Sequence, residues 1–296
     1  KNEKRSGMSS GTEQDQSRKI QSYYQQSEKA YLNWGRDLER DGIYALHCGF
    51  ERSDEPVEHW ESVKQLTREL ILFMGIDKKD IILDAGCGVG AASFEIKSQY
   101  PQATIHGINL ALNQLRVAQL FAETSVANRM LFSQQDYMQT AFPDSYFDKV
   151  VFVESIAHAQ TKVAAIKESG RILRNGGYLF IADVFFKRAP VSAEEVRWVE
   201  EIRRGWLMPD LNSIDTFTAD LETSGFSSVE CIDISGNTLP STLRMRENAE
   251  KRLSEEPDSQ QPVTDEIHNS REAIVASHKV LESGLVGYFF IKAKKE

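Results

Sequence analysis

Residues 80–91 read DIILDAGCGVGA, and this stretch decides the fold. An apolar run, Asp80–Asp84, is followed at once by three closely spaced glycines and then by a helical pattern over Ala91–Gln99. Glycines between a strand and a helix let the backbone turn tightly and let a ligand approach the main chain. The stretch therefore predicts a strand, a ligand-binding turn and a helix at the start of an α/β unit.

The alternation of apolar runs and amphipathic segments continues along the chain. After the first strand, we expect strands at Ala103–Asn109, Met130–Ser133, Phe147–Val153, Tyr178–Asp183, Val229–Ile234 and Gly287–Ala293. We expect further helices at Leu112–Glu123, Thr161–Leu173, Ser192–Ile202 and from Asp215 to Gly225. Strands that alternate with helices in this way predict an α/β fold, a mostly parallel sheet with helices on both faces.

The segments around this unit suggest additions to it. Residues 1–19 hold one large apolar side chain, Met8, and we expect a disordered tail. Residues 20–79 are rich in aromatic side chains and contain an amphipathic pattern over 57–74, which predicts an N-terminal helical cap. Within the main domain, 80–296, we expect lid elements at 184–214 and 236–283.

Composition excludes several classes of protein. The chain has 296 residues, a formal net charge of −9, 41% hydrophobic and 27% charged residues, which is typical of a globular protein. The acidic balance argues against a nucleic-acid partner. The sequence has no apolar stretch of roughly 20 residues that could span a membrane. Three scattered cysteines and the lack of an apolar signal segment favour a cytoplasmic protein without disulfides or structural zinc.

The glycine motif by itself leaves the ligand open. Gly86, Gly88 and Ala91 also satisfy the dinucleotide-binding pattern, so an NAD-dependent oxidoreductase and a non-catalytic nucleotide-binding module remain alternatives. Two features favour another ligand. Asp84 precedes the first glycine by two residues, and the second strand ends in Asn109 where NAD binding usually needs a carboxylate.

Four segments in order, ILDAGCGVG, GINL, QQDYMQTAFPDSYFDKVVFVES and RILRNGGYLFIAD, resemble the class I S-adenosylmethionine-dependent methyltransferases. The resemblance covers roughly residues 20–296. It implies a Rossmann-like sheet of seven strands, the last of them antiparallel beside the sixth, and S-adenosyl-L-methionine as the cofactor.

The resemblance also assigns cofactor contacts by position. It implies that Gly86, Gly88 and Gly90 pass under the methionine and ribose, and that Asp84 reaches the methionine ammonium. Asn109 would bond the ribose hydroxyls and Leu110 would pack on the adenine. Asp136 would accept from the adenine amino group, with Tyr137 alongside. Ordinary structural roles stay open for some of them, such as core packing for Leu110 and a loop cap for Asp136.

Two segments narrow the subgroup. Residues 41–50 (DGIYALHCGF) and 153–159 (VESIAHA) are similar to segments of sterol and geranyl diphosphate C-methyltransferases, which carry a glutamate at the position of Glu154. This resemblance implies C-methylation of an isoprenoid alkene through a carbocation, with or without cyclisation, and Glu154 as the base. If the methyl acceptor is instead a hydroxyl or amine of another natural product, His158 or His47 is a candidate general base. The candidates for stabilising the carbocation are Tyr24, Tyr44, Phe50, Phe185, Phe186 and Trp206.

The expected ligands follow from this interpretation. The substrate is a small, largely apolar molecule, and we expect no protein-bound metal. Mg²⁺ is expected only with a diphosphate substrate, which Lys187, Arg188, Arg203 and Arg204 would then face. The sequence leaves the oligomeric state open, a homodimer included.

Overall fold

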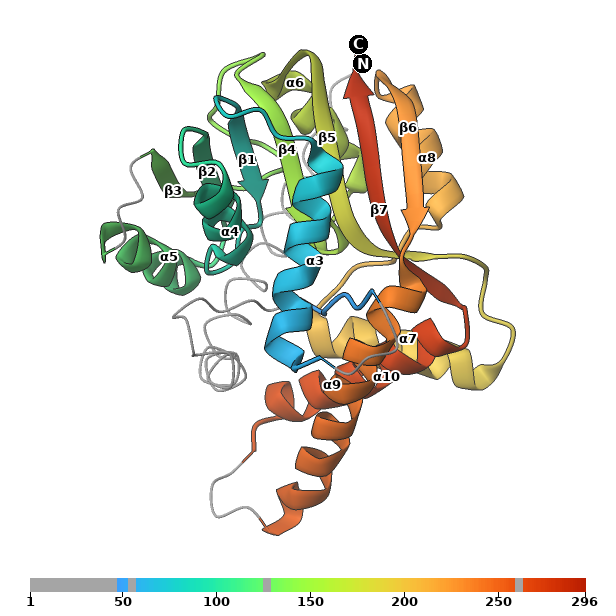
Figure 1. Ribbon diagram of the computed structural model, residues 1–296. Coiled ribbons are helices and arrows are strands. Elements are labelled where there is room, and N and C mark those ends of the chain that lie inside the picture. Colours follow the sequence, from blue (N-terminus) through green and yellow to red (C-terminus); the bar gives the residue numbers. More distant parts are fainter. Residues whose placement is uncertain (1–46, 53–56, 125–128, 259–262) are drawn as a thin grey trace, which may run out of the picture.

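The computed structural model describes residues 47–52, 57–124, 129–258 and 263–296. Its centre is one seven-stranded sheet in the order β3-β2-β1-β4-β5-β7-β6 (Figure 1). The strands are β1 Ile81–Ala85, β2 Thr104–Asn109, β3 Met130–Gln134, β4 Phe147–Val153, β5 Leu173–Phe186, β6 Phe226–Asp233 and β7 Val286–Lys295. All pairs are parallel except those of β7, which runs antiparallel to both β5 and β6. The predicted α/β fold class and antiparallel last strand are confirmed.

Helices cover both faces of the sheet, as predicted. One hydrophobic cluster contains Leu66 and Leu70 of α3 together with Phe94 and Ile96 of α4. A second cluster, which includes Ile166 of α6 and Phe217 of α8, forms the other layer. The helices of the sheet layers are α3 His59–Met74, α4 Ala91–Gln99, α5 Leu112–Thr124, α6 Lys162–Ile172 and α8 Ile214–Thr223.

Three more helices lie beyond the carboxyl ends of the parallel strands. They are α7 Ala193–Trp206, α9 Ser235–Glu255 and α10 Asp265–Glu282, and two 3-10 turns complete the described elements, η2 Ile156–His158 and η3 Glu256–Asp258. The pair α9 and α10 extends away from the sheet (Figure 1). In the described part of the chain, none of the helices has the length and apolar character needed to cross a bilayer.

Several predicted boundaries were wrong: β6 begins at Phe226 instead of Val229, and α7 continues to Trp206 instead of ending at Ile202. Strand β5 begins at Leu173 instead of Tyr178, because Leu173 already pairs with Phe147 and the strand continues through Gly176 and Gly177. A Cβ at Gly177 would lie 2.9 Å from the carbonyl oxygen of Asp148, so glycine permits this close strand contact. Helix α8 is capped by Ser213, whose side chain accepts from the Thr216 amide, and not by Asp215.

The N-terminal cap lies only partly within the described residues. The segment 20–46 falls outside them, whereas α3 begins at His59, two residues after the start of the predicted amphipathic pattern. The segment 47–51 runs between α3 and α9 and bonds to both. The Phe50 amide donates to the Ser62 carbonyl at 2.8 Å, and the Gly49 amide donates to Ser241 Oγ at 2.7 Å.

Candidate active site

A cavity opens at the carboxyl ends of β1, β2, β4 and β5, where the strand order reverses between β1 and β4. Open α/β sheets bind their ligands at such a reversal. The cavity encloses about 1730 Å³ when the solvent-open space at its mouth is included. Ten of the predicted site residues line it: His47, Asp84, Gly86, Gly88, Asn109, Leu110, Tyr137, Glu154, His158 and Trp206.

The glycine turn forms one wall of the cavity. Gly86 has φ +80°, and a Cβ there would lie 2.6 Å from Cβ of Ser155, so only glycine fits. Gly88 also has a positive φ and faces the cavity. Gly90 does not line it. Its φ of +90° starts α4, and an added Cβ would press on Phe94 and Phe132, so its role here is to let the helix pack closely.

Asp84 lies at the end of β1 with its side chain buried and accepts from Ser93 Oγ at 2.6 Å. Burial raises its pKa to about 6, although the bonds from Ser93 counteract this. On β2, Asn109 donates through Nδ2 to Gln114 Oε1 at 2.7 Å, and both residues line the cavity. A buried carboxylate and an amide on adjacent strand ends offer acceptors for an ammonium and for hydroxyl groups.

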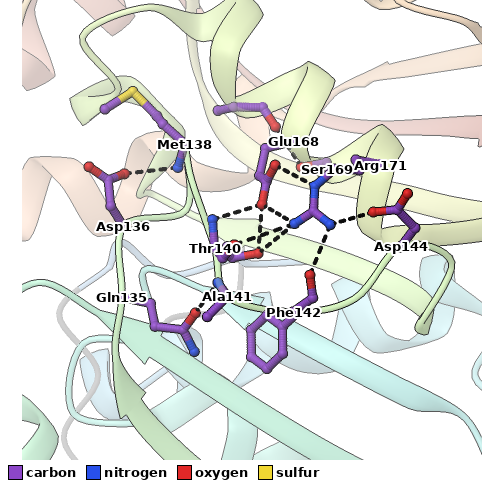
Figure 2. Close-up of polar contacts among 11 residues, drawn as sticks. Gln135, Asp136, Met138, Thr140, Ala141, Phe142, Asp144, Glu168, Ser169 and Arg171 are labelled. Carbon is purple, nitrogen blue, oxygen red and sulfur yellow. Dashed lines mark hydrogen bonds and ion pairs between the residues drawn. The ribbon is translucent and has the colours of Figure 1, made fainter. Parts of the chain in front are cut away.

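The connection between β3 and β4 brings Tyr137 into the cavity but not Asp136. The Tyr137 hydroxyl donates to the Ser155 carbonyl at 2.9 Å. Asp136 Oδ1 instead accepts from the Met138 amide at 2.8 Å, so it closes a turn of its own segment (Figure 2). This is the loop-cap role that the sequence left open for Asp136.

Glu154 follows β4 directly and takes a left-handed backbone conformation, φ +46°, which is uncommon for a non-glycine residue. Its Oε1 accepts from the Cys48 amide at 3.0 Å. Burial raises the pKa of Glu154 to about 7, the Cys48 amide opposes the rise, and the charge of Asp183 adds to it. A carboxyl with a pKa near neutrality can accept a proton at physiological pH.

The two predicted histidines differ in what they can do. His47 donates through Nδ1 to the Cys48 carbonyl at 2.8 Å, so its Nε2 accepts from Thr67 Oγ1 at 3.2 Å. Both ring nitrogens are therefore occupied, and His47 is a poor candidate for a general base. His158 lies on η2, and burial, followed by the charge of Lys162, lowers its pKa to about 4.

Three of the predicted substrate aromatics lie elsewhere. Phe50, Phe185 and Phe186 do not line the cavity, and this prediction is corrected. Val184 of β5 packs against the cluster of the α3 face and lines the cavity, whereas Phe185 belongs to the cluster of the opposite face. There Phe185 packs on Phe217 with ring centroids 4.7 Å apart. Phe186 and Phe50 pack in the core cluster of the α3 face, whereas Tyr24 and Tyr44 lie outside the described residues.

Sequence reasoning missed Asp183 and Tyr288, which both line the cavity. Asp183 near the end of β5 accepts from the amides of Val184 at 2.8 Å and Ala157 at 3.1 Å, and burial raises its pKa to about 6. The run YLFIAD ends in this residue, which was a usable signal. Tyr288 lies near the start of β7, and because that strand is antiparallel, its start meets the carboxyl ends of the others.

The outer wall of the cavity comes from both predicted lid segments. The segment 184–214 contributes Ile202, Trp206, Met208 and Leu211. The segment 236–283 contributes Thr242, Met245, Ser277, Val280 and Leu281. Most of these side chains are apolar. That the segments act as lids stays a prediction.

The basic residues considered for a diphosphate lie away from this wall. None of the four lines the cavity, and each pairs with a carboxylate. The pairs are Lys187 with Asp233, Arg188 with Glu195, Arg203 with both Glu200 and Asp210, and Arg204 with Glu272. Among the described residues, no group of three or more His, Cys, Asp or Glu side chains could hold a metal ion.

Comparisons with known proteins agree with this geometry. Residues 83–181 match the family model described as a methyltransferase domain. The chain is 30% identical to the O-methyltransferase cnsE of Penicillium expansum over 199 residues, 66% of this chain and 70% of that protein. It is 28% identical to the 27-O-demethylrifamycin SV methyltransferase of Amycolatopsis mediterranei, over 69% of this chain and 75% of that one.

Two further similarities are to a sterol C-methyltransferase and to a geranyl diphosphate methyltransferase. The sterol 24-C-methyltransferase of Kluyveromyces lactis is 27% identical over 76% of this chain and 61% of that protein. A geranyl diphosphate methyltransferase structure in complex with GPP and sinefungin superposes with a TM-score of 0.75 at 18% identity, covering 95% of this chain and all of that one. This last similarity shows the shared Rossmann-like fold.

Proposed function

Because the chain belongs to the class I S-adenosylmethionine-dependent methyltransferases, we propose that it methylates a hydroxyl group of a neutral, largely apolar natural product. That it is an S-adenosylmethionine-dependent methyltransferase of small molecules follows from the family. The methyl acceptor and the base, Glu154, are the parts that we propose. The observation that carries the proposal is the partly buried Glu154 carboxyl, with a pKa of about 7, in a cavity whose described lining has no Lys or Arg.

The residues of the glycine turn fit the cofactor. Gly86 and Gly88 leave room at the wall for a ligand to approach the main chain, and Asp84 and Asn109 supply acceptors beside them. Bound S-adenosylmethionine supplies an electrophilic methyl group on a sulfonium. The protein must hold the acceptor in line with the carbon–sulfur bond, which is an effect of proximity and orientation.

The proton balance gives Glu154 its role. Methyl transfer from bound S-adenosylmethionine to the acceptor oxygen would leave the carbon–sulfur electron pair on sulfur, and the hydroxyl proton would have to be removed. The hydroxyl proton passes to the Glu154 carboxylate, which is about half ionised at its pKa of about 7. The Cys48 amide at 3.0 Å holds Oε1 in place, and the other carboxylate oxygen is the proposed acceptor.

The lining of the cavity supports a neutral, apolar substrate. Aliphatic and methionine side chains such as Val184, Met208 and Met245 outnumber the three aromatic ones, Tyr137, Trp206 and Tyr288. A diphosphate would need positive charge, which this lining does not supply among the described residues. Two relatives are named O-methyltransferase cnsE and 27-O-demethylrifamycin SV methyltransferase, and these names support an oxygen acceptor.

Methylation of an isoprenoid alkene carbon is the second candidate. Glu154 could equally remove the proton that a carbocation loses, and the sterol 24-C-methyltransferase similarity supports this acceptor. Among the described residues, the aromatic side chains that line the cavity and could stabilise such a cation are Tyr137, Trp206 and Tyr288. The relative that is 30% identical is named an O-methyltransferase, so we place carbon methylation second.

One substrate probe separates the two candidates. Farnesol carries both a hydroxyl and alkene carbons, so it can be incubated with the enzyme and S-adenosylmethionine labelled with ¹³C in the methyl group. We expect the ¹³C chemical shift of the labelled product to be that of an O-methyl carbon. The same shift is expected when hydroxylated macrolides are tested as substrates in parallel. A methyl carbon bonded to carbon would establish the second candidate, and turnover of geranyl diphosphate but not of farnesol would refute the neutral substrate.

A further inference from the structure

A dense polar cluster lies outside the cavity, between the end of α6 and the β3–β4 connection. Its centre is the ion pair of Arg171 with Glu168, with Nη2–Oε1 at 2.6 Å and Nε–Oε2 at 2.9 Å (Figure 2). Thr140 of the connection joins it, because its amide and its Oγ1 both donate to Glu168 Oε1, at 2.7 and 2.6 Å. We call Glu168, Arg171 and Thr140 the α6 clamp.

The clamp grips the connection at more than one point. Arg171 Nη1 donates to the Phe142 carbonyl at 2.9 Å and to Asp144 Oδ1 at 2.6 Å. The side chain of Glu168 is only 11% exposed and that of Arg171 34%, whereas that of Asp144 is 77% exposed. Charged hydrogen bonds that are shielded from water are the stronger ones. The bonds between Glu168 and Thr140 therefore contribute more to holding the β3–β4 connection in place than the bond to Asp144 does.

The turn at residues 135–141, between the α6 clamp and the cavity, is held by contacts within itself. Asp136 Oδ1 accepts from the Met138 amide at 2.8 Å, and Gln135 Oε1 accepts from the Ala141 amide at 2.8 Å (Figure 2). A bridge between Asp136 and Gln139 closes the same turn. A shift of Thr140 therefore moves residues 135–139 with it.

Tyr137 links this turn to the glycine wall. Its hydroxyl donates to the Ser155 carbonyl, and Ser155 Oγ donates to the Ala85 carbonyl at 2.6 Å, one residue before Gly86. A Cβ added at Gly86 would lie 2.6 Å from Cβ of Ser155 and 3.5 Å from the ring of Tyr137. The position of Tyr137 thus defines the width of the cavity beside Gly86.

We propose that the α6 clamp is a positioning element for the cofactor site: it sets the affinity for S-adenosylmethionine through Tyr137 without touching the cofactor. The inference rests on the proposed use of the wall at Gly86 by the cofactor. It does not depend on which acceptor is methylated. Arg171 and Glu168 are accordingly positioning residues, and their loss should raise the KM for S-adenosylmethionine more than it lowers kcat.

The test compares Arg171→Met and Glu168→Ala with a matched control, Arg174→Met. Arg174 forms an ion pair with Asp148 at the same distance of 2.6 Å, and that side chain bonds to Asp148 and not to the β3–β4 connection at residues 135–144. We expect the Kd for S-adenosylhomocysteine, measured by calorimetry, to rise about tenfold in both clamp variants, which is about 1.4 kcal/mol, and to change less than about twofold in the control. The KM for S-adenosylmethionine should rise in parallel while kcat at saturation stays near the native value.

Conservative variants keep the test decisive if a clamp variant folds poorly. Glu168→Gln keeps an oxygen that can accept from Thr140, and Arg171→Lys keeps the charge, so both should recover part of the affinity. If Arg171→Met and Arg174→Met bind S-adenosylhomocysteine equally well, the positioning role is wrong. If the wild type does not bind S-adenosylhomocysteine, both the positioning role and the cofactor assignment are wrong. If the wild type binds it but does not methylate farnesol, only the proposed acceptor is wrong.

Discussion

The Cys48 amide donates to Oε1 of Glu154 at 3.0 Å across 106 residues of sequence. This bond ties the segment before α3 to the carboxyl end of β4. It fixes one oxygen of the carboxylate while Glu154 remains part of the cavity wall. The arrangement gives Glu154 a defined orientation, which a base needs, and makes its contribution measurable.

Glu154→Gln should reduce kcat at least about 100-fold, the lower range for loss of a general base. The amide oxygen can still accept from Cys48, so the geometry should persist and the Kd for S-adenosylhomocysteine should stay within about twofold. Glu51→Gln is the control, because Glu51 is a buried glutamate that is bonded to Arg244 and lies outside the cavity lining. Near-native turnover in Glu154→Gln would remove Glu154 as the base.

The dependence of stability on pH should show the titration of Glu154. The pKa of Glu154 is about 7 in the folded state, whereas its ordinary value is 4.5. Between pH 4.5 and pH 7 the folded state therefore binds the Glu154 proton more tightly than the unfolded state does. Its contribution to stability is therefore complete below pH 4.5 and is lost as the pH rises through 7. Replacement by Gln removes this loss, so Glu154→Gln should raise Tm relative to the wild type more at pH 8 than at pH 5. An equal difference in Tm at both pH values would contradict the raised pKa.

Gly86→Ala should weaken cofactor binding by more than its backbone strain explains. Gly86 and Gly225 have similar φ values, +80° and +90°, so alanine costs each about 1–2 kcal/mol of stability. Only at Gly86 does the new Cβ clash, at 2.6 Å from Ser155, whereas at Gly225 nothing lies within 4 Å. We expect calorimetry to show a loss of at least about tenfold in affinity for S-adenosylhomocysteine in Gly86→Ala and none in Gly225→Ala. Equal affinities in the two variants would show that the glycine wall does not face the cofactor.

The alternation along β5 separates stability from substrate recognition at adjacent residues. Phe185→Ala should lower the free energy of unfolding by about 3–5 kcal/mol, because this ring is buried against Phe217. Val184→Ala should cost much less and should change the KM for the methyl acceptor, since Val184 lines the cavity. Denaturant unfolding and steady-state kinetics on both variants check this, and a change in acceptor KM without loss of stability in Phe185→Ala would reverse the assignment.

Much of the site was predictable because parallel strands end at a common edge. Asp84, Asn109 and Glu154 stand at the ends of predicted strands, and all three line the cavity. The same rule applied to Asp183 would have found it. It gave no distinction between Asp136 and Tyr137, because which side chain of a turn points inward depends on bonds within that turn, such as the one from Met138 to Asp136.

The sequence by itself determined the α/β sheet and the glycine turn, since these depend on local periodicity and on backbone angles that few residues allow, whereas the antiparallel last strand was implied by the family resemblance. Only the tertiary structure decided which side chains of β5 meet the cavity, because in the apolar run from Val184 to Phe186 either phase of the alternation buries large side chains. It alone also brought Cys48, Glu154 and Tyr288 together. Their contact depends on how strands and helices distant in sequence pack, and burial by that packing raises the pKa of Glu154.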